Sequence, residues 1–222
     1  MNVFPEQRGT ISLFAYEGPK DGLLASASAG QREGAIVAVI LEELKLPYRL
    51  HLVKEPEDID AKRLPVLRNI QSDGESVDLS GLHDIGSYLI TRYDTAHVVS
   101  YKKGSKEDEE VNSLVASLTE PNAAHLKEHR FDLDAKDGIP FARKAISLYL
   151  LLGQRLQNSH SDFLVGKKCT LADLLHLPYV AAAGSAHLDL EMFPELTRWY
   201  DRVYQRPAVQ KGFDAVHLKI RG

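Results

Sequence analysis

The sequence has few of the residues that build disulfide frameworks, zinc sites or membrane spans. Its single cysteine, Cys169, excludes an intramolecular disulfide and any structural zinc site that needs several thiolates. The longest apolar run, Ala35 to Leu41, is far shorter than the roughly 20 residues that cross a bilayer. The first residues, MNVFPEQRGT, lack the basic and then apolar pattern of a secretory signal. These absences predict a protein of the reducing cytoplasm.

Basic residues are also too few and too scattered to indicate a nucleic-acid partner. Lysine and arginine number 27 against 31 acidic residues, which gives a net charge of −4, and the chain has no basic block. Its 222 residues, of which 44% are hydrophobic and 26% charged, are enough to bury a core without disulfides or metals. We therefore expect one large globular domain or two small ones.

Strand and helix patterns alternate at the beginning of the chain. Residues 10–16 and residues 48–53 each alternate in polarity, which predicts two strands. Between them, an apolar stretch runs directly into helix-forming residues, which predicts a buried helix over residues 31–46 that ends before Pro47. A strand, a helix and a strand in this order predict a right-handed parallel βαβ unit.

A hairpin and a helix are predicted next. Residues 66–70 and 76–79 flank an Asp-Gly pair at positions 73–74, and Asp-Gly supplies the positive φ angles that a tight antiparallel turn needs. Ser80 is placed to cap a helix that runs to about Tyr93, with apolar residues on its buried side. The first part of the chain thus forms a small four-stranded sheet with helices.

The second half of the chain is helical almost throughout, with apolar residues at helical spacing. Helices are predicted over residues 105–120, 139–157 and 193–205. Thr170 with Asp173 forms a capping box that begins a further helix, and Cys169 beside it is expected to be a small buried hydrophobe. The division predicted is an α+β domain over residues 1–94, a linker over 95–104 and an all-helical domain over 105–222.

Several local motifs resemble, in order and over essentially the whole chain, those of the soluble glutathione S-transferase superfamily. They are LEELKLPYRLHL at 41–52, RLPVL at 63–67, Ile85 with Tyr88 and Leu89, Gly166 with TLAD at 170–173, and FPELTRWYDRVYQRPAV at 193–209. The resemblance implies an N-terminal thioredoxin-like β-α-β-β-β-α domain with a four-stranded mixed sheet. It also implies an all-helical C-terminal domain that contributes an apolar wall for the substrate.

The resemblance further implies a glutathione site. In the family, a turn with a cis X-Pro bond holds the cysteinyl unit as an extra strand, and Leu64-Pro65 matches that turn. The start of the family's third helix binds the γ-glutamyl carboxylate. Here Ser80, Gly81 and Leu82 stand where the family has Glu-Ser or Gln-Ser. Either Ser80 binds the carboxylate, or the bare N–H groups of Gly81 and Leu82 bind it alone.

The glycyl carboxylate of glutathione needs a positive charge. Lys54 and Arg63 are the nearest candidates, and Lys54 has the weaker claim. The segment between them is short, which leaves little room for the family's second helix.

The residue that activates the thiol is the second departure from the family pattern. The family uses a hydroxyl or forms a mixed disulfide with cysteine, and the lack of any cysteine before Cys169 excludes the disulfide type. The hydroxyl candidates are Tyr16, Ser26 and Ser28. Ser28 is favoured because it lies nearest to the helix start, and the alternative is activation by a backbone amide. The Asn-Gly of fungal Ure2-like transferases is Glu33-Gly34 here.

The function implied is that of a metal-free, glutathione-dependent enzyme with a small hydrophobic electrophile as its second substrate. The thiolate would add to an electron-poor carbon, either to conjugate the substrate or to isomerise a conjugated olefin from cis to trans. The loops resemble those of fungal transferases in natural-product pathways. A homodimer is expected from the family. The alternative is a non-catalytic binding or regulatory protein that kept the fold.

Overall fold

The computed structural model describes residues 10–17, 22–23, 29–54, 64–71, 73–119, 138–181 and 189–219. Within these ranges, a four-stranded sheet has the order β3-β1-β4-β5. The strands are β1 Thr10–Tyr16, β3 Tyr48–Val53, β4 Val66–Ile70 and β5 Ser76–Ser80. β1 pairs with β3 in parallel, whereas the pairs β1–β4 and β4–β5 are antiparallel. The predicted βαβ unit and hairpin, and hence the mixed sheet, are confirmed.

The hairpin between β4 and β5 uses one of its two predicted turn residues for the positive φ. Gly74 has a φ of 87°, whereas Asp73 accepts a hydrogen bond on its side chain from the Glu75 N–H at 3.0 Å. The Gln71 N–H donates to the Glu75 carbonyl at 2.7 Å and closes the turn. The aspartate therefore acts here through its carboxylate.

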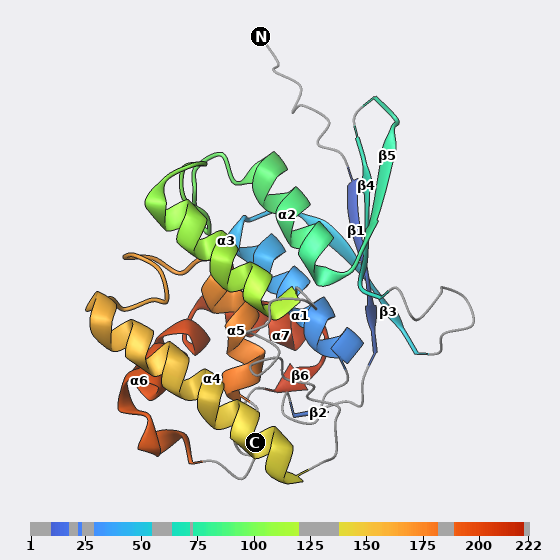
Figure 1. The fold of residues 1–222 in the computed structure, drawn as a ribbon. Helices are drawn as coiled ribbons and strands as arrows, with labels where there is room; N and C mark the ends of the chain where they lie inside the picture. Colours follow the sequence, from blue (N-terminus) through green and yellow to red (C-terminus); the bar gives the residue numbers. More distant parts are fainter. Residues whose placement is uncertain are drawn as a thin grey trace.

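Helix α1 (Ala29–Glu43) is the centre of the molecule. Residues 35–41 are at most 1% exposed, because β1 and α2 cover one side of the helix while α5 and α7 cover the other (Figure 1). The contact with α7 is so close that a Cβ at Gly212 would lie 2.5 Å from the Val39 backbone nitrogen. This position explains why the sequence of α1 is apolar on every side.

The end of α1 is a Schellman motif, which stops the helix earlier than predicted. The Leu46 N–H donates to the Leu41 carbonyl at 3.0 Å, and the Lys45 N–H donates to the Glu42 carbonyl at 3.1 Å. Lys45 takes the left-handed position of this motif, with a φ of 53°. The helix consequently ends at Glu43 rather than at residue 46, and Pro47 follows outside it.

Helix α2 (Leu82–Tyr93) ends where the sequence predicted but begins differently. Its N-cap is Gly81, with φ 83° and ψ 148°, and no side chain caps it. The prediction that Ser80 caps this helix is wrong, because Ser80 is the last residue of β5. The chain turns from strand to helix within one residue, and glycine provides the backbone conformation that this turn needs.

The second half consists of helices, as predicted, and the resemblance to a thioredoxin-like domain followed by a helical domain holds. The helices are α3 Lys106–Thr119, α4 Gly138–Ser159, α5 Leu171–Ala181, α6 Pro194–Tyr204 and α7 Pro207–Ala215. A short 3-10 helix, Leu190–Met192, precedes α6. Two short strands, β2 Gly22–Leu23 and β6 Leu218–Lys219, pair in parallel. Two residues are too few to show alternation, so the sequence did not predict them.

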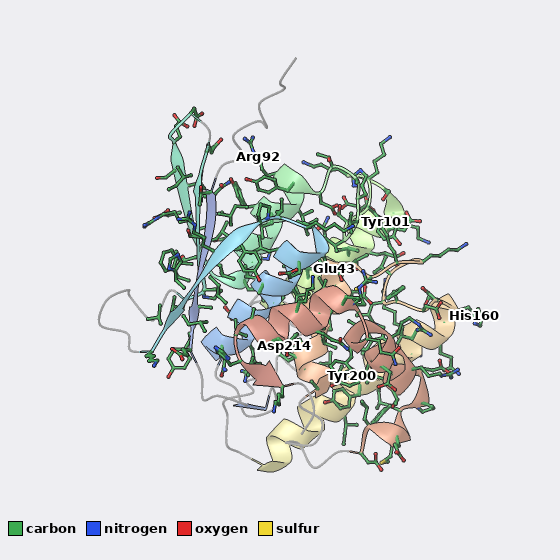
Figure 2. The ribbon with its side chains drawn as sticks, turned by 180° about the vertical axis from the view of Figure 1, so that it is seen from behind. Glu43, Arg92, Tyr101, His160, Tyr200 and Asp214 are labelled. Carbon is green, nitrogen blue, oxygen red and sulfur yellow. The ribbon has the colours of Figure 1, made fainter. Side chains whose placement is uncertain are left out.

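The two halves of the chain are joined by a buried ion pair at the end of α1. Arg206, the N-cap of α7, donates from Nε and Nη2 to the two oxygens of Glu43 at 2.6 and 2.8 Å. The Glu43 carboxylate is nearly inaccessible and needs this partner, since an isolated buried charge is costly. Figure 2, which views the molecule from behind, shows Glu43 where α1 meets α7.

Asp173 is the polar centre of the helical half. Its Oδ2 accepts hydrogen bonds from the N–H and the hydroxyl of Thr170 at 2.8 and 2.9 Å, which confirms the predicted capping box. Its Oδ1 accepts from the Leu164 N–H at 2.8 Å and from Nε1 of Trp199 at 2.7 Å. Burial raises the pKa of Asp173, and these donors act in the opposite direction. One carboxylate thus fastens α5, α6 and the segment before α5.

Asp173→Ala should lower the free energy of unfolding by about 3 kcal/mol or more, because several buried donors lose their acceptor at once. Urea denaturation followed by circular dichroism measures this loss. Asp189→Ala is the matched control, since Asp189 caps an exposed turn through one bond to the Glu191 N–H. The control should cost about 1 kcal/mol at most. Equal effects of the two substitutions would contradict the central role of Asp173.

His176 makes the stability of the protein sensitive to acid. It is buried in α5, its Nδ1–H donates to the Ala172 carbonyl at 2.7 Å, and burial lowers its pKa to about 4. Between pH 6.5 and 4 the unfolded chain binds a proton that the folded chain refuses, so stability falls as the pH falls through this window. The loss should approach about 3 kcal/mol. Urea midpoints of the wild type and of His176→Gln, measured from pH 7 to 4, should converge as the pH decreases.

Candidate functional site

Several strands and helices begin or finish at one end of the sheet. The parallel pair of β1 and β3 finishes with Tyr16 opposite Val53, and the ladder between β1 and β4 finishes with Phe14 opposite Val66. α1 begins against the same end of β1, because a Cβ at Gly34 would lie 2.7 Å from the Cβ of Ala15. Figure 1 shows the starts of α1, α2 and β4 gathered there.

The peptide bond between Leu64 and Pro65 is cis, as the resemblance implied. Leu64 lies beyond the last pair of the β1–β4 ladder, at the end of the sheet where β4 begins. The Pro65 carbonyl accepts a hydrogen bond from the Gly81 N–H at 2.9 Å. The structure therefore brings Leu64 and Pro65 next to Ser80, Gly81 and Leu82, residues that the sequence separates by about fifteen positions.

The start of α2 has one backbone partner in the structure. The Gly81 N–H donates to the Pro65 carbonyl at 2.9 Å, and no side chain caps the helix. Glu33, on the first turns of α1, has its pKa raised by burial, whereas the backbone of Leu82 and the charge of Arg32 act to lower it. The two alternatives for the γ-glutamyl carboxylate, Ser80 or the N–H groups of Gly81 and Leu82, stay predictions.

The remaining predicted residues divide into two groups. Tyr16 lies half-buried at the end of β1, one residue beyond the contact between Ala15 and Gly34. Lys54 lies at the same end of the sheet, 77% exposed, with its Nζ 3.9 Å from a carboxylate oxygen of Glu17. Three further candidates lie outside the described residues, namely Ser26, Ser28 and Arg63.

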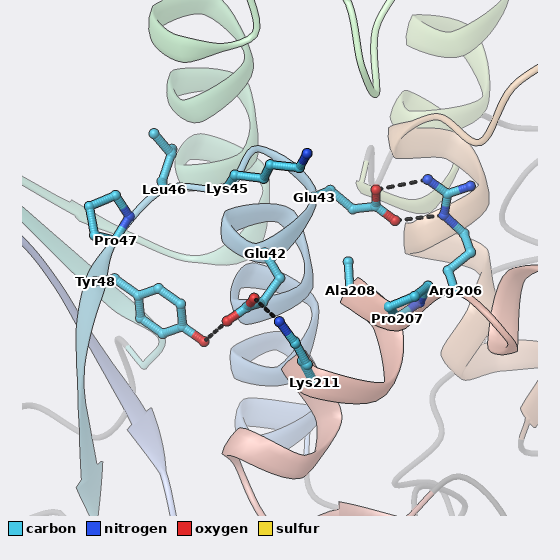
Figure 3. Close-up of a pocket in the computed structure, with 10 residues that line it drawn as sticks. All are labelled: Glu42, Glu43, Lys45, Leu46, Pro47, Tyr48, Arg206, Pro207, Ala208 and Lys211. Atoms are coloured by element: carbon cyan, nitrogen blue, oxygen red, sulfur yellow. Dashed lines mark hydrogen bonds and ion pairs between the residues drawn. The ribbon is translucent and has the colours of Figure 1, made fainter.

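A groove of about 910 Å³ lies at the opposite end of α1, between that helix, the start of β3 and α7 (Figure 3). Its charged groups are largely paired with one another, since Glu43 binds Arg206 while Glu42 accepts from the Tyr48 hydroxyl at 3.3 Å and lies 3.9 Å from Lys211. Burial and the charge of Glu42 raise the pKa of Tyr48 to about 12. The groove contains none of the predicted site residues.

The described residues show neither a metal-binding cluster nor a membrane-spanning helix. These ranges contain no cluster of three or more histidine, cysteine, aspartate or glutamate residues that could hold a metal ion. No helix among them combines the length and the apolar character that a membrane crossing requires.

Residues 144–207 match the sequence profile of the family "Glutathione S-transferase, C-terminal domain". The chain is 28% identical to the Glutathione S-transferase-like protein gedE of Aspergillus terreus, over 81% of this chain and 89% of that protein. It is 26% identical to the Glutathione S-transferase-like protein tpcF of Aspergillus fumigatus, over 79% and 88%. The fold matches a glutathione transferase homolog from Lodderomyces elongisporus, solved with two glutathione molecules per subunit. That match has a TM-score of 0.71 and 24% identity, and covers 92% of this chain and 98% of the other.

By these matches and by its mixed sheet, the chain is similar to cytosolic glutathione S-transferases. It also resembles fungal Ure2-like proteins. It is 23% identical to Protein URE2 of Candida albicans, over 93% of this chain and 74% of that protein.

Gly81→Ala should destabilise the protein although nothing lies within 4 Å of the added methyl group. The φ of 83° with ψ of 148° is open to glycine and strained for alanine, so the free energy of unfolding should fall by about 1–3 kcal/mol. The matched control is Gly153→Ala in α4, which has equal space but no positive φ. There alanine should stabilise the helix by up to about 1 kcal/mol. Urea denaturation of both variants should therefore give shifts of opposite sign.

Proposed function

We propose that this protein is a glutathione-dependent enzyme that activates the glutathione thiol for addition to a small electrophilic molecule. One observation carries the proposal. The cis-proline edge at Leu64-Pro65, the start of α2 and the end of β1 converge in a chain whose near full-length relatives are glutathione S-transferase-like proteins. Structures of the same fold have been solved with glutathione bound, including Ure2p in complex with glutathione.

Glutathione would lie along this edge in an extended conformation. Its cysteinyl unit would pair with the backbone of Leu64, which stands beyond the end of the β1–β4 ladder. Its γ-glutamyl end would reach the turn formed by Ser80, Gly81 and Leu82, where the positive end of the α2 dipole favours a carboxylate. Its glycyl carboxylate would point toward Lys54 and Arg63.

The thiol would be activated by a hydroxyl close to the end of β1. A free thiol has a pKa near 8.5, and lowering it by about two units favours the thiolate by roughly 2.7 kcal/mol. A hydrogen bond from a hydroxyl and a nearby helix N-terminus are sufficient for such a change. The candidates for this hydroxyl are Tyr16, the last residue of β1, and Ser26 and Ser28, which precede α1 in the sequence.

The reaction would begin with attack of the thiolate on an electron-poor carbon of a conjugated olefin. If a proton is then taken up at the neighbouring carbon, the product is a glutathione conjugate. If the adduct instead rotates about the former double bond and expels the thiolate, the olefin is isomerised and glutathione is returned. A bacterial maleylacetoacetate isomerase, from Anaeromyxobacter dehalogenans, shares the fold with a TM-score of 0.66 at 18% identity. The fungal relatives support a place in secondary metabolism.

The working form would be a cytoplasmic homodimer in which α2 of one subunit packs against the helical domain of the other. α4 exposes apolar side chains in that domain, among them Leu150 at 58% and Ile146 at 38%, which are available for a second copy or for a hydrophobic substrate. The electrophile would bind between the helical domain and the thiol.

The second candidate function is that of a non-catalytic binding or regulatory protein with the glutathione S-transferase fold. It is favoured by the start of α2, where the Gly81 N–H is already bound to the Pro65 carbonyl at 2.9 Å and no side chain caps the helix. Glutathione would then bind weakly or not at all.

Incubation with glutathione and cis-configured conjugated enones separates these possibilities, with free thiol and alkene geometry measured together. Conjugation consumes one thiol per product, whereas isomerisation gives the trans alkene with the thiol unchanged. Glutathione binding by calorimetry without any turnover would favour the binding protein. The triple variant Tyr16→Phe, Ser26→Ala, Ser28→Ala should lose at least about 90% of the rate and retain glutathione binding. Full activity in that variant would contradict activation by a hydroxyl.

A further inference from the structure

Strand β6, which follows α7, is paired with the short strand β2 that precedes α1. The pairing is parallel, with Leu218 opposite Gly22 and Lys219 opposite Leu23 (Figure 1). A pair of two-residue strands is weak by itself, so its position depends on an anchor. The side chain of Leu218 provides this anchor, because it is only 1% exposed and belongs to the hydrophobic core. The position of β2 is therefore tied to that of β6.

The first turn of α1 is attached to the same part of the chain. The side chain of Gln31 is 1% exposed, and its Nε2 donates to the Val216 carbonyl at 3.5 Å. Val216 is buried at the end of α7, which packs along α1. His217, with a φ of 59°, then leads from α7 into β6. Residues 216–219, called the C-terminal segment below, thus hold both β2 and the start of α1.

The two attachment points enclose two of the three hydroxyl candidates in the sequence. Residues 24–28 lie between β2 and α1 and include Ser26 and Ser28. Tyr16 belongs to β1 instead, where it pairs with Val53. A short stretch whose two ends are fixed has less conformational freedom to lose when it orients a hydroxyl. The C-terminal segment therefore bears on the two serines and not on the tyrosine.

We propose that the C-terminal segment is a positioning element of the glutathione site, which holds both flanks of residues 24–28 and thereby places Ser26 or Ser28 to stabilise the thiolate. This inference rests on the proposed function and deepens it, because it assigns thiol activation to this stretch rather than to Tyr16. The C-terminal segment acts through the stretch and does not itself touch glutathione.

Loss of β6 should affect the thiolate more than the binding of glutathione. A hydrogen bond stabilises a thiolate only while its donor is correctly placed, and a released stretch keeps its hydroxyl there for a smaller fraction of the time. The pKa of the bound thiol should then rise toward its free value of about 8.5. The pairing of the cysteinyl unit with Leu64 depends on backbone groups beyond the β1–β4 ladder, which β6 does not contact through its pairing with β2.

The pKa of the thiol of bound glutathione, measured from the ultraviolet absorbance of the thiolate over a pH series, tests the inference. In a chain that ends at Val216 and so lacks β6, this pKa should be higher than in the wild type by about one unit or more. The thiolate fraction then falls about tenfold at pH values below both pKa values. The rate with a conjugated enone should recover at high pH, where the thiolate forms without help. The affinity for glutathione should stay within about threefold of the wild type.

Two further variants separate the role of β6 from a general loss of stability. A chain that ends at Lys219 is the matched control, because it is also shortened but keeps β6. Its thiol pKa should equal that of the wild type. Leu218→Ala in the full chain serves if the chain that ends at Val216 does not fold. It removes the buried side chain that anchors β6 and should raise the thiol pKa in the same direction by a smaller amount.

The inference is supported if the thiol pKa rises when β6 is lost and is unchanged when β6 is kept. A wild-type pKa in the folded variants that lack β6 or its anchor would overturn it and leave the proposed function standing, with Tyr16 as the activating residue. An equal rise in the chain that ends at Lys219 would overturn it too, because β6 would not be the cause. Absence of glutathione binding in the wild type, or a wild-type thiol pKa equal to that of free glutathione, would overturn the proposed function and the inference with it.

Discussion

The burial of α1 on all sides is the constraint on which the rest of this structure depends. A helix whose residues 35–41 are all buried must be covered by the sheet and by helices of the second half together. The two halves therefore cannot form separate cores. The elements on both sides of α1 must approach it closely, and glycines allow this: Gly34 of α1 lies against β1, and Gly212 of α7 lies against α1.

A helix fixed in this manner also fixes what stands at its two ends. At its C-terminal end, Glu43 is held by Arg206 and ties the sheet domain to the helical domain. At its N-terminal end, Gly34 is packed against Ala15 near the end of β1, which fixes where the helix begins relative to the sheet.

The elements with strong local patterns were predictable. Period-two alternation identified β1 and β3, the Asp-Gly turn identified the β4–β5 hairpin, and Thr170 with Asp173 identified the start of α5. Local patterns did not predict the helix ends that tertiary contacts or backbone geometry determine. Lys45 takes a left-handed conformation that ends α1 early, and Gly81 rather than Ser80 begins α2. Neither residue type signals these roles by itself.

The candidate site shows the same division. By itself, the sequence determined the order of strands and helices and the limits set by a single cysteine, because these properties depend on neighbouring residues and on composition. Its resemblance to a family also predicted the cis-proline turn. Only the tertiary structure decided which groups occupy the start of α2. Pro65 and Gly81, whose backbone groups are hydrogen-bonded there, lie sixteen positions apart in the sequence. No local pattern joins them, and their contact exists because β4 and β5 pair with Val66 opposite Ser80.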